Sequence, residues 1–337
     1  MAAQHMMSAS VDAQVQCIAR CAVRALYAEV VLEPKPGLVS LRDNGSHTDM
    51  TAATFVKSLF ALRHYFVHMA RAGALAHPFE FLQALGLGAE ERMLLATGGV
   101  NTHRGAVFAL GLLCAAAGRL AAKGKPFSAP ALRDCLMQQW GQALRWRAAS
   151  AAQSAPLSNG QHAARRFGLR SAGEEAAMGF PTLFDCTLPA LQAALHTGHA
   201  PRAARVQAFF ATMALLDDTN TAHRGGLEGA QFVKAAAQGF LDAGGVARSD
   251  WLAQARAIHA DFVARRLSPG GSADVLAAAC WLQELQTHAD VASAAPELQG
   301  KLHAAVAPSR RSLARSAAKS SAQAAASPAA LASVWAS

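Results

Sequence analysis

The sequence has few charged or aromatic residues and lacks the familiar nucleotide-binding and hydrolase motifs. Charged residues make up 16% and aromatic residues 7% of the 337 positions, whereas hydrophobic residues make up 52%. No GxxxxGK[ST] loop, no GxGxxG after a strand, no HExxH and no GxSxG occurs. A chain of this length and composition can bury a sizeable core. Any nucleotide that it binds must therefore be held without these motifs.

Paired cysteine motifs are also missing. None of the six cysteines forms a CxxC, and no third cysteine extends the pair Cys17 and Cys21 into an iron–sulfur spacing. These two residues lie one helical turn apart in an apolar pattern. We interpret the cysteines as small core residues of a protein in a reducing compartment rather than as metal ligands.

No secretory signal is visible, because no basic region precedes an apolar run at the N-terminus. The longest apolar stretch, 105–118, is too short to span a bilayer and is flanked by Arg104 and Arg119. We therefore expect a cytoplasmic protein with no membrane partner.

The net charge of +9 is concentrated at the C-terminal end. No acidic residue follows Glu297, whereas five basic residues do: Lys301, Arg310, Arg311, Arg315 and Lys319. No aromatic residues that could stack on bases interleave with these charges. We expect a solvated tail and no nucleic-acid partner.

Apolar residues recur at helical spacing almost throughout, and alternating β-branched runs are scarce. This pattern predicts an all-α protein: a disordered N-terminus at 1–9, one compact multi-helix catalytic domain at 10–303, and a disordered, basic, Ala/Ser-rich tail at 304–337. Segment 150–166 is expected to be a long loop. The expected helices are 10–33, 50–72, 78–86, 88–97, 102–122, 128–149, 171–179, 186–198, 201–217, 225–242, 248–266 and 272–287.

The dense Gly, Asn, Asp and His residues gather between these helices. They occupy PKPGLVSLRDNGSHTDM (34–50), GGVNTHRG (98–105), FGLRSAGEEAAMGFP (167–181), DDTNTAHRGG (217–226) and LSPGGSAD (267–274). Polar residues on connecting segments are typical of functional sites carried by a rigid scaffold. The sequence thus predicts a site built from loops and helix N-termini at one end of a helical body.

The first expected helix has a carboxylate on its apolar stripe. Val15, Ile18, Ala22 and Ala25 are followed on the same face by Glu29. A buried carboxylate needs a partner, so Glu29 is either a site residue or, if the helix rotates slightly, an exposed one. Lys35, between two prolines, can hold an anion as a point charge.

Two segments place His and Arg where a helix begins. NTHRG contains His103 and Arg104, and NTAHRGG contains His223 and Arg224. The N-terminus of a helix carries partial positive charge, so cations there are unfavourable unless an anion binds. A polyphosphate would resolve this conflict, because backbone N–H groups, the helix dipole and the arginines would all face it. The alternative is two unrelated solvated turns.

The remaining site candidates are oxygen ligands and helix caps. Asp217, Asp218, Asn220 and Asp49 suit Mg²⁺, which binds through one or two carboxylates plus phosphate oxygens, but Asp49 could equally cap the next helix. Thr102 is expected to cap the helix starting at His103, and Gly105 lets a backbone or ligand come close. Ser272 and Asp274 are explained as a cap and a dipole partner.

The five segments together resemble the triphosphoribosyl-dephospho-CoA synthases, which serve citrate lyase and malonate decarboxylase. The resemblance covers about residues 10–290 and rests on EVVLEPKPGLV, GSHTDM, GGVNTHRGAVFALGLL, GLRSAGEEAAMGFP, DDTNTAHRGG and LSPGGSADVLA. Ser40 departs from the family pattern, which has Asp after PKPGLV. We favour the malonate decarboxylase branch because the chain looks like a free-standing synthase.

The resemblance implies an enzyme of the pentosyltransferase type. It moves the 5-triphosphoribosyl group of ATP to the 2′-hydroxyl of 3′-dephospho-CoA and releases adenine, with Mg²⁺ as the expected metal. The product passes to a holo-carrier-protein synthase. Its α linkage, against the β linkage of ATP, implies one inverting displacement.

The same resemblance suggests roles for individual residues. Glu29, Asp49 and Asp218 are the catalytic candidates, and Asp217, Asp218 and Asp49 the metal ligands. The expected substrate and phosphate groups are Lys35, Gly37, His47, Asn101, Thr102, His103, Arg104, Arg170, Glu174, Asn220, His223 and Arg224, with Glu175 a further candidate. The alternative functions are a Mg²⁺-dependent helical nucleotide glycohydrolase or phosphohydrolase, and a non-catalytic module that delivers the precursor.

Overall fold

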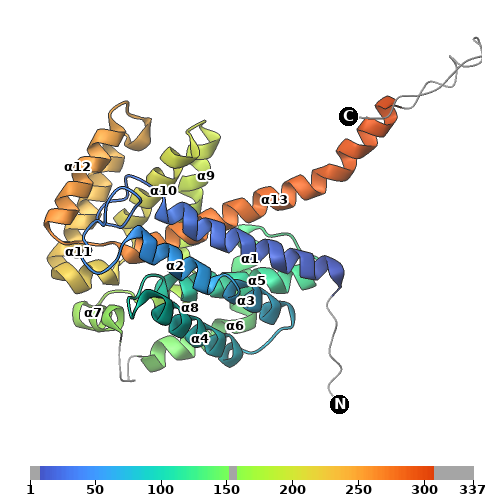
Figure 1. Cartoon of the computed structure of the whole chain (residues 1–337), viewed down its shortest axis with the longest axis horizontal. Coiled ribbons are helices and arrows are strands. Elements are labelled where there is room, and N and C mark those ends of the chain that lie inside the picture. Colours follow the sequence, from blue (N-terminus) through green and yellow to red (C-terminus); the bar gives the residue numbers. More distant parts are fainter. Residues whose placement is uncertain (1–7, 152–157, 307–337) are drawn as a thin grey trace, which may run out of the picture. The chain divides into compact units, whose positions relative to one another are not determined.

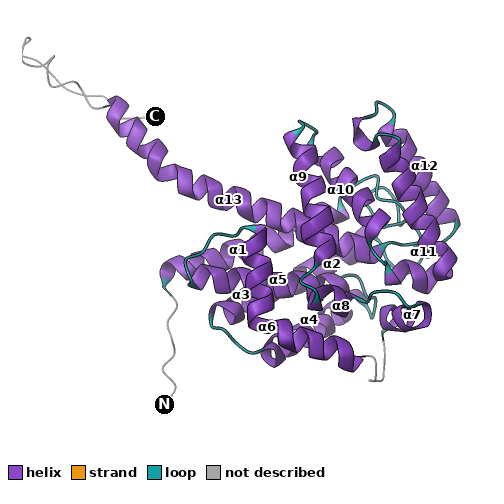
Figure 2. Ribbon diagram, turned by 180° about the vertical axis from the view of Figure 1, so that it is seen from behind, coloured by secondary structure: helices purple, strands orange, loops and turns teal. Residues whose placement is uncertain are grey.

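The computed structural model describes residues 8–151 and 158–306, and every regular element in these ranges is a helix (Figure 2). The predicted all-α class is therefore confirmed. In chain order the elements are α1 Ala9–Val30, α2 Ala52–Leu62, α3 Tyr65–Ala74, α4 Phe79–Thr97, α5 Arg104–Ala122, α6 Ala129–Ala151, α7 Asn159–Phe167, α8 Ala172–Ala177, the π-helical turn η1 Leu183–Thr187, α9 Leu188–His196, α10 Pro201–Leu215, α11 Thr219–Asp242, the 3₁₀ turn η2 Gly245–Ala247, α12 Trp251–Ala264 and α13 Gly270–Val306.

The chain divides into two units, residues 1–289 and 290–337, and everything discussed below lies in the first. The segments expected to be disordered, 1–9 and 304–337, fall mostly outside the described residues. Those expected boundaries stay predictions.

Several helix boundaries differ from the sequence-based ones. The expected helix 50–72 is two helices, α2 and α3, separated at Arg63 and His64. Conversely, 78–86 and 88–97 form the single helix α4, because Gly86 and Gly88 cost some helix propensity without breaking the hydrogen-bonding pattern. The last expected helix, 272–287, is longer in both directions and runs from Gly270 to Val306.

Helix α5 is the centre of the core. It packs against α1, α3, α4 and α6, and most of its residues are buried. It is the one helix of the described chain that is long and apolar enough to cross a membrane, but 72% of its apolar window is buried inside the protein. This burial is typical of the core helix of a soluble protein.

The α3–α5 contact depends on two glycines. A Cβ on Gly73 would lie 1.8 Å from the Ala115 carbonyl oxygen, and one on Gly118 would lie 1.9 Å from that of Ala70. The two backbones therefore approach more closely than any side chain would allow.

The N-terminal half of α13 packs beside α1. The indole of the fully buried Trp281 donates a hydrogen bond to the Ile18 carbonyl oxygen at 3.1 Å. Helix α5 also packs on α1, and the first turns of α5 and α13 meet at Gly105 and Asp274. A Cβ on Gly105 would lie 1.9 Å from Asp274 Oδ2, so a side chain at position 105 would push these helix ends apart. The fold thus brings polar segments from distant parts of the chain to one place.

We predict that Gly118→Ala lowers the free energy of unfolding by about 1–3 kcal/mol, because the new methyl group overlaps the α3 backbone. The matched control is Gly239→Ala, at an exposed position of α11 where a Cβ meets nothing within 4 Å. This control should raise stability by about 0.5–1 kcal/mol through helix propensity. Urea unfolding followed by circular dichroism measures both changes, and equal effects of the two variants would contradict the close α3–α5 packing.

Candidate active site

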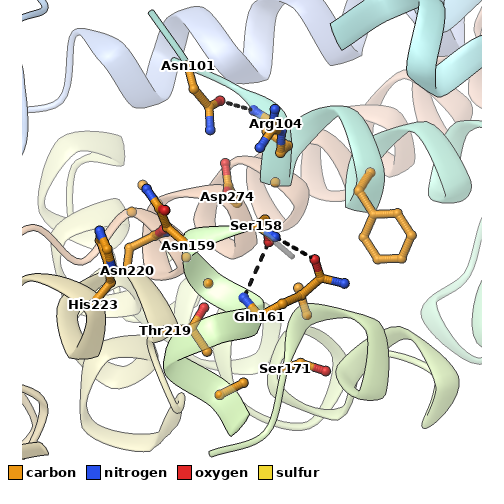
Figure 3. Close-up of a pocket in the computed structure, with 18 of the residues that line it drawn as sticks. Asn101, Arg104, Ser158, Asn159, Gln161, Ser171, Thr219, Asn220, His223 and Asp274 are labelled. Atoms are coloured by element: carbon orange, nitrogen blue, oxygen red, sulfur yellow. Dashed lines mark hydrogen bonds between the residues drawn. The ribbon is translucent and has the colours of Figure 1, made fainter. Parts of the chain in front are cut away.

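One large cavity collects residues from all five polar segments. Its volume is about 1750 Å³, and each of the stretches 34–50, 98–105, 167–181, 217–226 and 267–274 contributes to its wall. Figure 3 shows Arg104, Asp274 and Asn220 arranged around this space, with residues of α7 below them. The expectation that loops and helix N-termini build one site at the helix ends is confirmed.

Helix α7 is an element of the site that the sequence analysis missed. Residues 159–167 lie in the expected loop but form a helix packed on α11 (Figure 1). The Ser158 side chain accepts a hydrogen bond from Gln161 N, and Gln161 Oε1 accepts one from Ser158 N at 2.9 Å. This reciprocal capping box has the sequence signature S-x-x-Q, which was the available signal. Residues 158–161 line the cavity.

Glu29 and Lys35 form a buried ion pair at the end of α1. Glu29 is 5% and Lys35 2% exposed. The ammonium group donates to the Glu29 carboxylate and also to the Glu29 carbonyl oxygen at 2.8 Å. Of the two positions that the sequence left open for Glu29, the structure shows the buried one. Because its ammonium group is already engaged with Glu29, Lys35 is not a freely available point charge in this state.

The start of α5 is capped differently from the prediction. Asn101 Oδ1, and not Thr102, accepts a hydrogen bond from a backbone amide of the first turn, that of Arg104, at 3.1 Å. The Thr102 hydroxyl is buried without a hydrogen-bond partner among the described residues. The Arg104 guanidinium donates to Glu90 Oε2 at 2.9 Å. Arg104 therefore faces the cavity already paired with a carboxylate.

His103 is a neutral group in this site. It is 2% exposed, and its Nδ1 lies 2.7 Å from the Ser58 hydroxyl. Burial, with a smaller contribution from Lys35, lowers the pKa of His103 to about 3. The imidazole thus offers no positive charge at neutral pH, although it lines the cavity. Its Nε2 is buried and has no hydrogen-bond partner within the described chain.

Asp218 joins the starts of α11 and α13. One carboxylate oxygen accepts from the amides of Asn220 and Thr221, both at 3.1 Å. The other accepts from the amide and hydroxyl of Ser272, at 2.8 and 2.9 Å. The sequence had suggested that Ser272 caps α13. Instead, the helix already begins at Gly270 and the Ser272 hydroxyl donates to Asp218. Burial raises the pKa of Asp218, although these hydrogen bonds oppose the shift.

His47, Arg224 and Ser268 form a hydrogen-bonded group at the cavity wall. Arg224 Nη2 lies 3.0 Å from His47 Nδ1, and Ser268 Oγ lies 2.8 Å from His47 Nε2. A guanidinium group can only donate, so Nδ1 accepts and Nε2 carries the proton. Burial and then Arg224 lower the pKa of His47. In this tautomer His47 cannot take a proton from Ser268, which argues against a serine nucleophile.

The predicted metal ligands do not converge. Asp217 accepts from Lys234 Nζ at 2.6 Å and from Arg170 N at 3.3 Å, and both oxygens of Asp218 are engaged as described. Asp49 is 59% exposed and lies 3.6 Å from His47 Nδ1; Thr51, and not Asp49, caps α2. Of these three carboxylates, Asp49 has the greatest freedom to bind an ion.

Glu174 and Glu175 have structural contacts. Glu174 completes a capping box with Ser171 at the start of α8. Glu175 is buried, where it accepts from Thr182 N at 2.6 Å and pairs with Arg170 at 3.0 Å. Both side chains therefore hold the segment that carries Arg170 at the cavity wall.

The remaining predicted residues line the cavity or support it. Asn220 and His223 are exposed on the first turns of α11 and point into the space (Figure 3). Gly37 has a positive φ of 74°, and a Cβ there would lie 2.2 Å from the Leu267 carbonyl oxygen. Gly37 therefore contributes a close backbone approach between segments 34–50 and 267–274.

Asp274 is the cavity residue whose role the sequence analysis understated. It projects from the first turns of α13 into the space between Arg104 and α7 (Figure 3). The Ala106 amide donates to it, and its pKa is raised well above the usual range by burial and by the nearby charges of Glu29 and Asp218. A carboxyl group with a raised pKa is suited to donating a proton.

All six cysteines are free. Among the described residues, Cys21, Glu284 and His288 form the one group of three potential metal ligands. Arg24 Nη1 lies 3.1 Å from Glu284 and 3.5 Å from His288, so the polar groups of this cluster are satisfied by an arginine.

Comparison with known proteins gives one consistent result. Residues 15–292 match the family described as ATP:dephospho-CoA triphosphoribosyl transferase. The chain is 41% identical over 259 residues to the 2-(5″-triphosphoribosyl)-3′-dephosphocoenzyme-A synthase of Pectobacterium atrosepticum, covering 75% of this chain and 84% of that protein. The synthase of the same name from Klebsiella pneumoniae is 40% identical over 265 residues, covering 77% and 87%. No solved structure matches.

We predict that His103 lowers the stability of the protein as the pH falls from 7 to 5.5, whereas Asp218 and Asp274, whose pKa values are raised, act in the opposite direction. The folded-state pKa of His103 is about 3 and the unfolded value is about 6.5. Below about pH 6.5 the unfolded chain binds a proton that the folded protein excludes, so folding loses up to about 1.4 kcal/mol per pH unit from this group.

His47, whose pKa is also lowered, adds a loss of the same sign. Urea unfolding at the two pH values should show a smaller loss for His103→Gln than for the unaltered protein. An imidazole resonance of His103 that titrates near pH 6.5 in the folded protein would contradict the buried, neutral assignment.

Proposed function

The chain belongs to the ATP:dephospho-CoA triphosphoribosyl transferase family, and we propose that its cavity transfers the 5-triphosphoribosyl group of ATP to the 2′-hydroxyl of 3′-dephospho-CoA, releasing adenine. The observation that carries this proposal is the convergence of the five polar segments on one cavity inside the matched region. We further propose that the reaction takes place in the cytoplasm.

The size and charge of the cavity fit two phosphorylated substrates. A volume of about 1750 Å³ exceeds the roughly 300–1,000 Å³ of a typical small-molecule pocket. Its wall carries seven side chains that are cationic at neutral pH: Lys35, Arg104, Arg145, Arg147, Arg165, Arg170 and Arg224. Such a surface can accept the triphosphate of one substrate and the diphosphate of the other.

We assign the triphosphate mainly to the two arginines at helix starts. Arg224 donates to the carbonyl oxygens of Ser46 and Arg266 and to His47, so its charge is not neutralised by a carboxylate in direct contact. Arg104 is paired with Glu90, which a more highly charged triphosphate can displace. His103, being neutral, would serve as a hydrogen-bonding group rather than as a cation.

The reaction requires a group that stabilises the positive charge developing on the ribose ring. As the bond to adenine breaks, the sugar acquires oxocarbenium character, which a fixed carboxylate stabilises. Glu29 fits this role because it is buried at the cavity wall and held rigidly by Lys35. A single inverting displacement also needs a base for the 2′-hydroxyl and an acid for adenine, by analogy with inverting glycosidases. Asp49, exposed at the wall, is the proposed base.

We propose that Mg²⁺ enters with the triphosphate. Mg²⁺ usually keeps several waters and binds through one or two carboxylates plus substrate phosphates. The Asn220 side-chain oxygen and the phosphates would hold the ion, since Asp217 and Asp218 are engaged by Lys234, by Ser272 and by backbone amides and Asp49 is the proposed base. The ion, when bound, would neutralise charge on the triphosphate.

We propose the malonate decarboxylase carrier protein, rather than that of citrate lyase, as the final recipient. The product leaves as a diffusible small molecule that passes to a holo-carrier-protein synthase, so activity of the isolated enzyme does not distinguish the branches. To distinguish them, the gene for this protein is deleted and the masses of both carrier proteins are measured by mass spectrometry. A citrate lyase carrier that alone loses its prosthetic group would overturn this assignment.

We predict that the purified chain releases adenine from ATP only when dephospho-CoA is present, with one adduct formed per adenine. Liquid chromatography with mass spectrometry measures both products. EDTA should abolish turnover and added Mg²⁺ restore it. Adenine released without the acceptor would indicate a glycohydrolase, and release of phosphate or ADP a phosphohydrolase.

We predict that Arg104→Met and Arg224→Met each raise the KM for ATP by about 10- to 100-fold, since a hydrogen bond to a charged group contributes about 1.5–3 kcal/mol. The matched control is Arg248→Met, an exposed arginine paired with Asp250 outside the cavity. Steady-state kinetics at saturating dephospho-CoA give the values. An unchanged KM in both cavity variants would remove the helix starts from triphosphate binding.

A further inference from the structure

Adenine needs a proton as it departs, and a carboxyl group at the cavity wall can supply it. Six carboxyl side chains line the cavity: Glu29, Asp49, Glu90, Glu174, Asp217 and Asp274. Three of them are in ion pairs: Glu29 pairs with Lys35, Glu90 with Arg104 and Asp217 with Lys234. Glu174 is the partner of Ser171 in a capping box. Asp49 is mostly exposed beside His47.

Asp274 differs from the other five carboxyl groups in its contacts. No ion pair to it occurs in the described chain, and the Ala106 amide is its backbone donor. The absence of a side chain at Gly105 makes room for it, because a Cβ there would lie 1.9 Å from Oδ2. The carboxyl group is thus held in place by backbone while part of its surface faces the cavity (Figure 3).

We propose that Asp274 is the general acid that protonates adenine as the bond between ribose C1″ and purine N9 breaks. This inference rests on the proposed function and assigns one further residue to it. The electron pair of the C1″–N9 bond moves onto the purine, and the Asp274 proton moves to a purine ring nitrogen, so adenine leaves neutral. The 2′-oxygen of dephospho-CoA forms the new bond to C1″, and its proton passes to the base.

The charges around Asp274 favour a protonated carboxyl group. The Glu29 and Asp218 carboxylates, from α1 and from the start of α11, both raise its pKa in addition to burial. Arg104 lies near it in Figure 3, but its guanidinium is paired with Glu90, and the Lys35 ammonium is engaged by Glu29. No nearby side-chain cation therefore pairs with ionised Asp274. An acid retaining its proton near neutral pH is what the departure of a basic purine requires.

A purely structural role would have different consequences. Asp274 lies near the N-terminus of α13, where a carboxylate can complement the helix dipole. Loss of that effect would weaken folding or binding for every substrate equally. Loss of a general acid affects only those substrates whose leaving base needs a proton. A substrate pair differing in this one property therefore separates the two roles.

The experiment compares ATP with 7-methyl-ATP, whose methylated purine departs as a neutral base without proton transfer. We expect Asp274→Asn to lower kcat with ATP by about 10²- to 10⁴-fold, the usual range for a general acid, with little change in KM. With 7-methyl-ATP the same variant should stay within about tenfold of the unaltered enzyme, which also shows that it is folded. Asp134→Asn, at an exposed position of α6 outside the cavity, is the matched control.

The pH profile provides a second readout. With ATP, kcat of the unaltered enzyme should fall as pH rises through the pKa of Asp274, and 7-methyl-ATP should remove this alkaline limb. An equal loss of kcat in Asp274→Asn on both substrates would overturn the acid assignment in favour of a structural or base role. Full activity of the variant with ATP would also overturn the acid assignment. Absence of any adduct from the unaltered enzyme would instead reject the proposed function itself.

Discussion

Helix N-termini that are brought together repel one another, and the site depends on carboxylates that offset this repulsion. The first turns of α5, α11 and α13 meet at one cavity, and each carries partial positive charge. Asp218 accepts hydrogen bonds from both α11 and α13, and Asp274 links α13 to α5 through the Ala106 amide. These two side chains let three helix starts face one space, where Arg224, whose hydrogen bonds go to carbonyl oxygens and to His47, can meet an anion.

Both kinds of charge line the one cavity. Arg104 and Arg224 lie at helix starts, whereas the buried Glu29–Lys35 pair lies at the end of α1. A triphosphate must remain attached while the bond at the other end of the ribose breaks. The proposed roles of the arginines on the phosphates and of Glu29 at the sugar would serve these two needs.

The sequence predicted the architecture and the segments of the site more reliably than individual contacts. Helical periodicity is local, so the all-α class could be read directly, whereas for Glu29 it left a buried and an exposed position open, and the structure shows the buried one. The family resemblance agreed with the comparisons over most of the chain. The caps proposed at Thr102 and Ser272 were wrong for different reasons. Asn101, one residue earlier, accepts from the Arg104 amide in place of Thr102, whereas Ser272 donates to Asp218, 54 positions away. The neutrality of His103 arises from burial and was not visible from spacing alone.

Helix α5 is both the central helix of the core and, at its first turn, part of the cavity wall. A ligand that binds the native state adds its binding free energy to the work needed to unfold the protein. A ligand in the cavity should therefore stabilise the whole interior against unfolding, and not only the loops that it contacts. Amide protons deep in α5, far from any substrate, would then exchange with solvent more slowly whenever substrate is present.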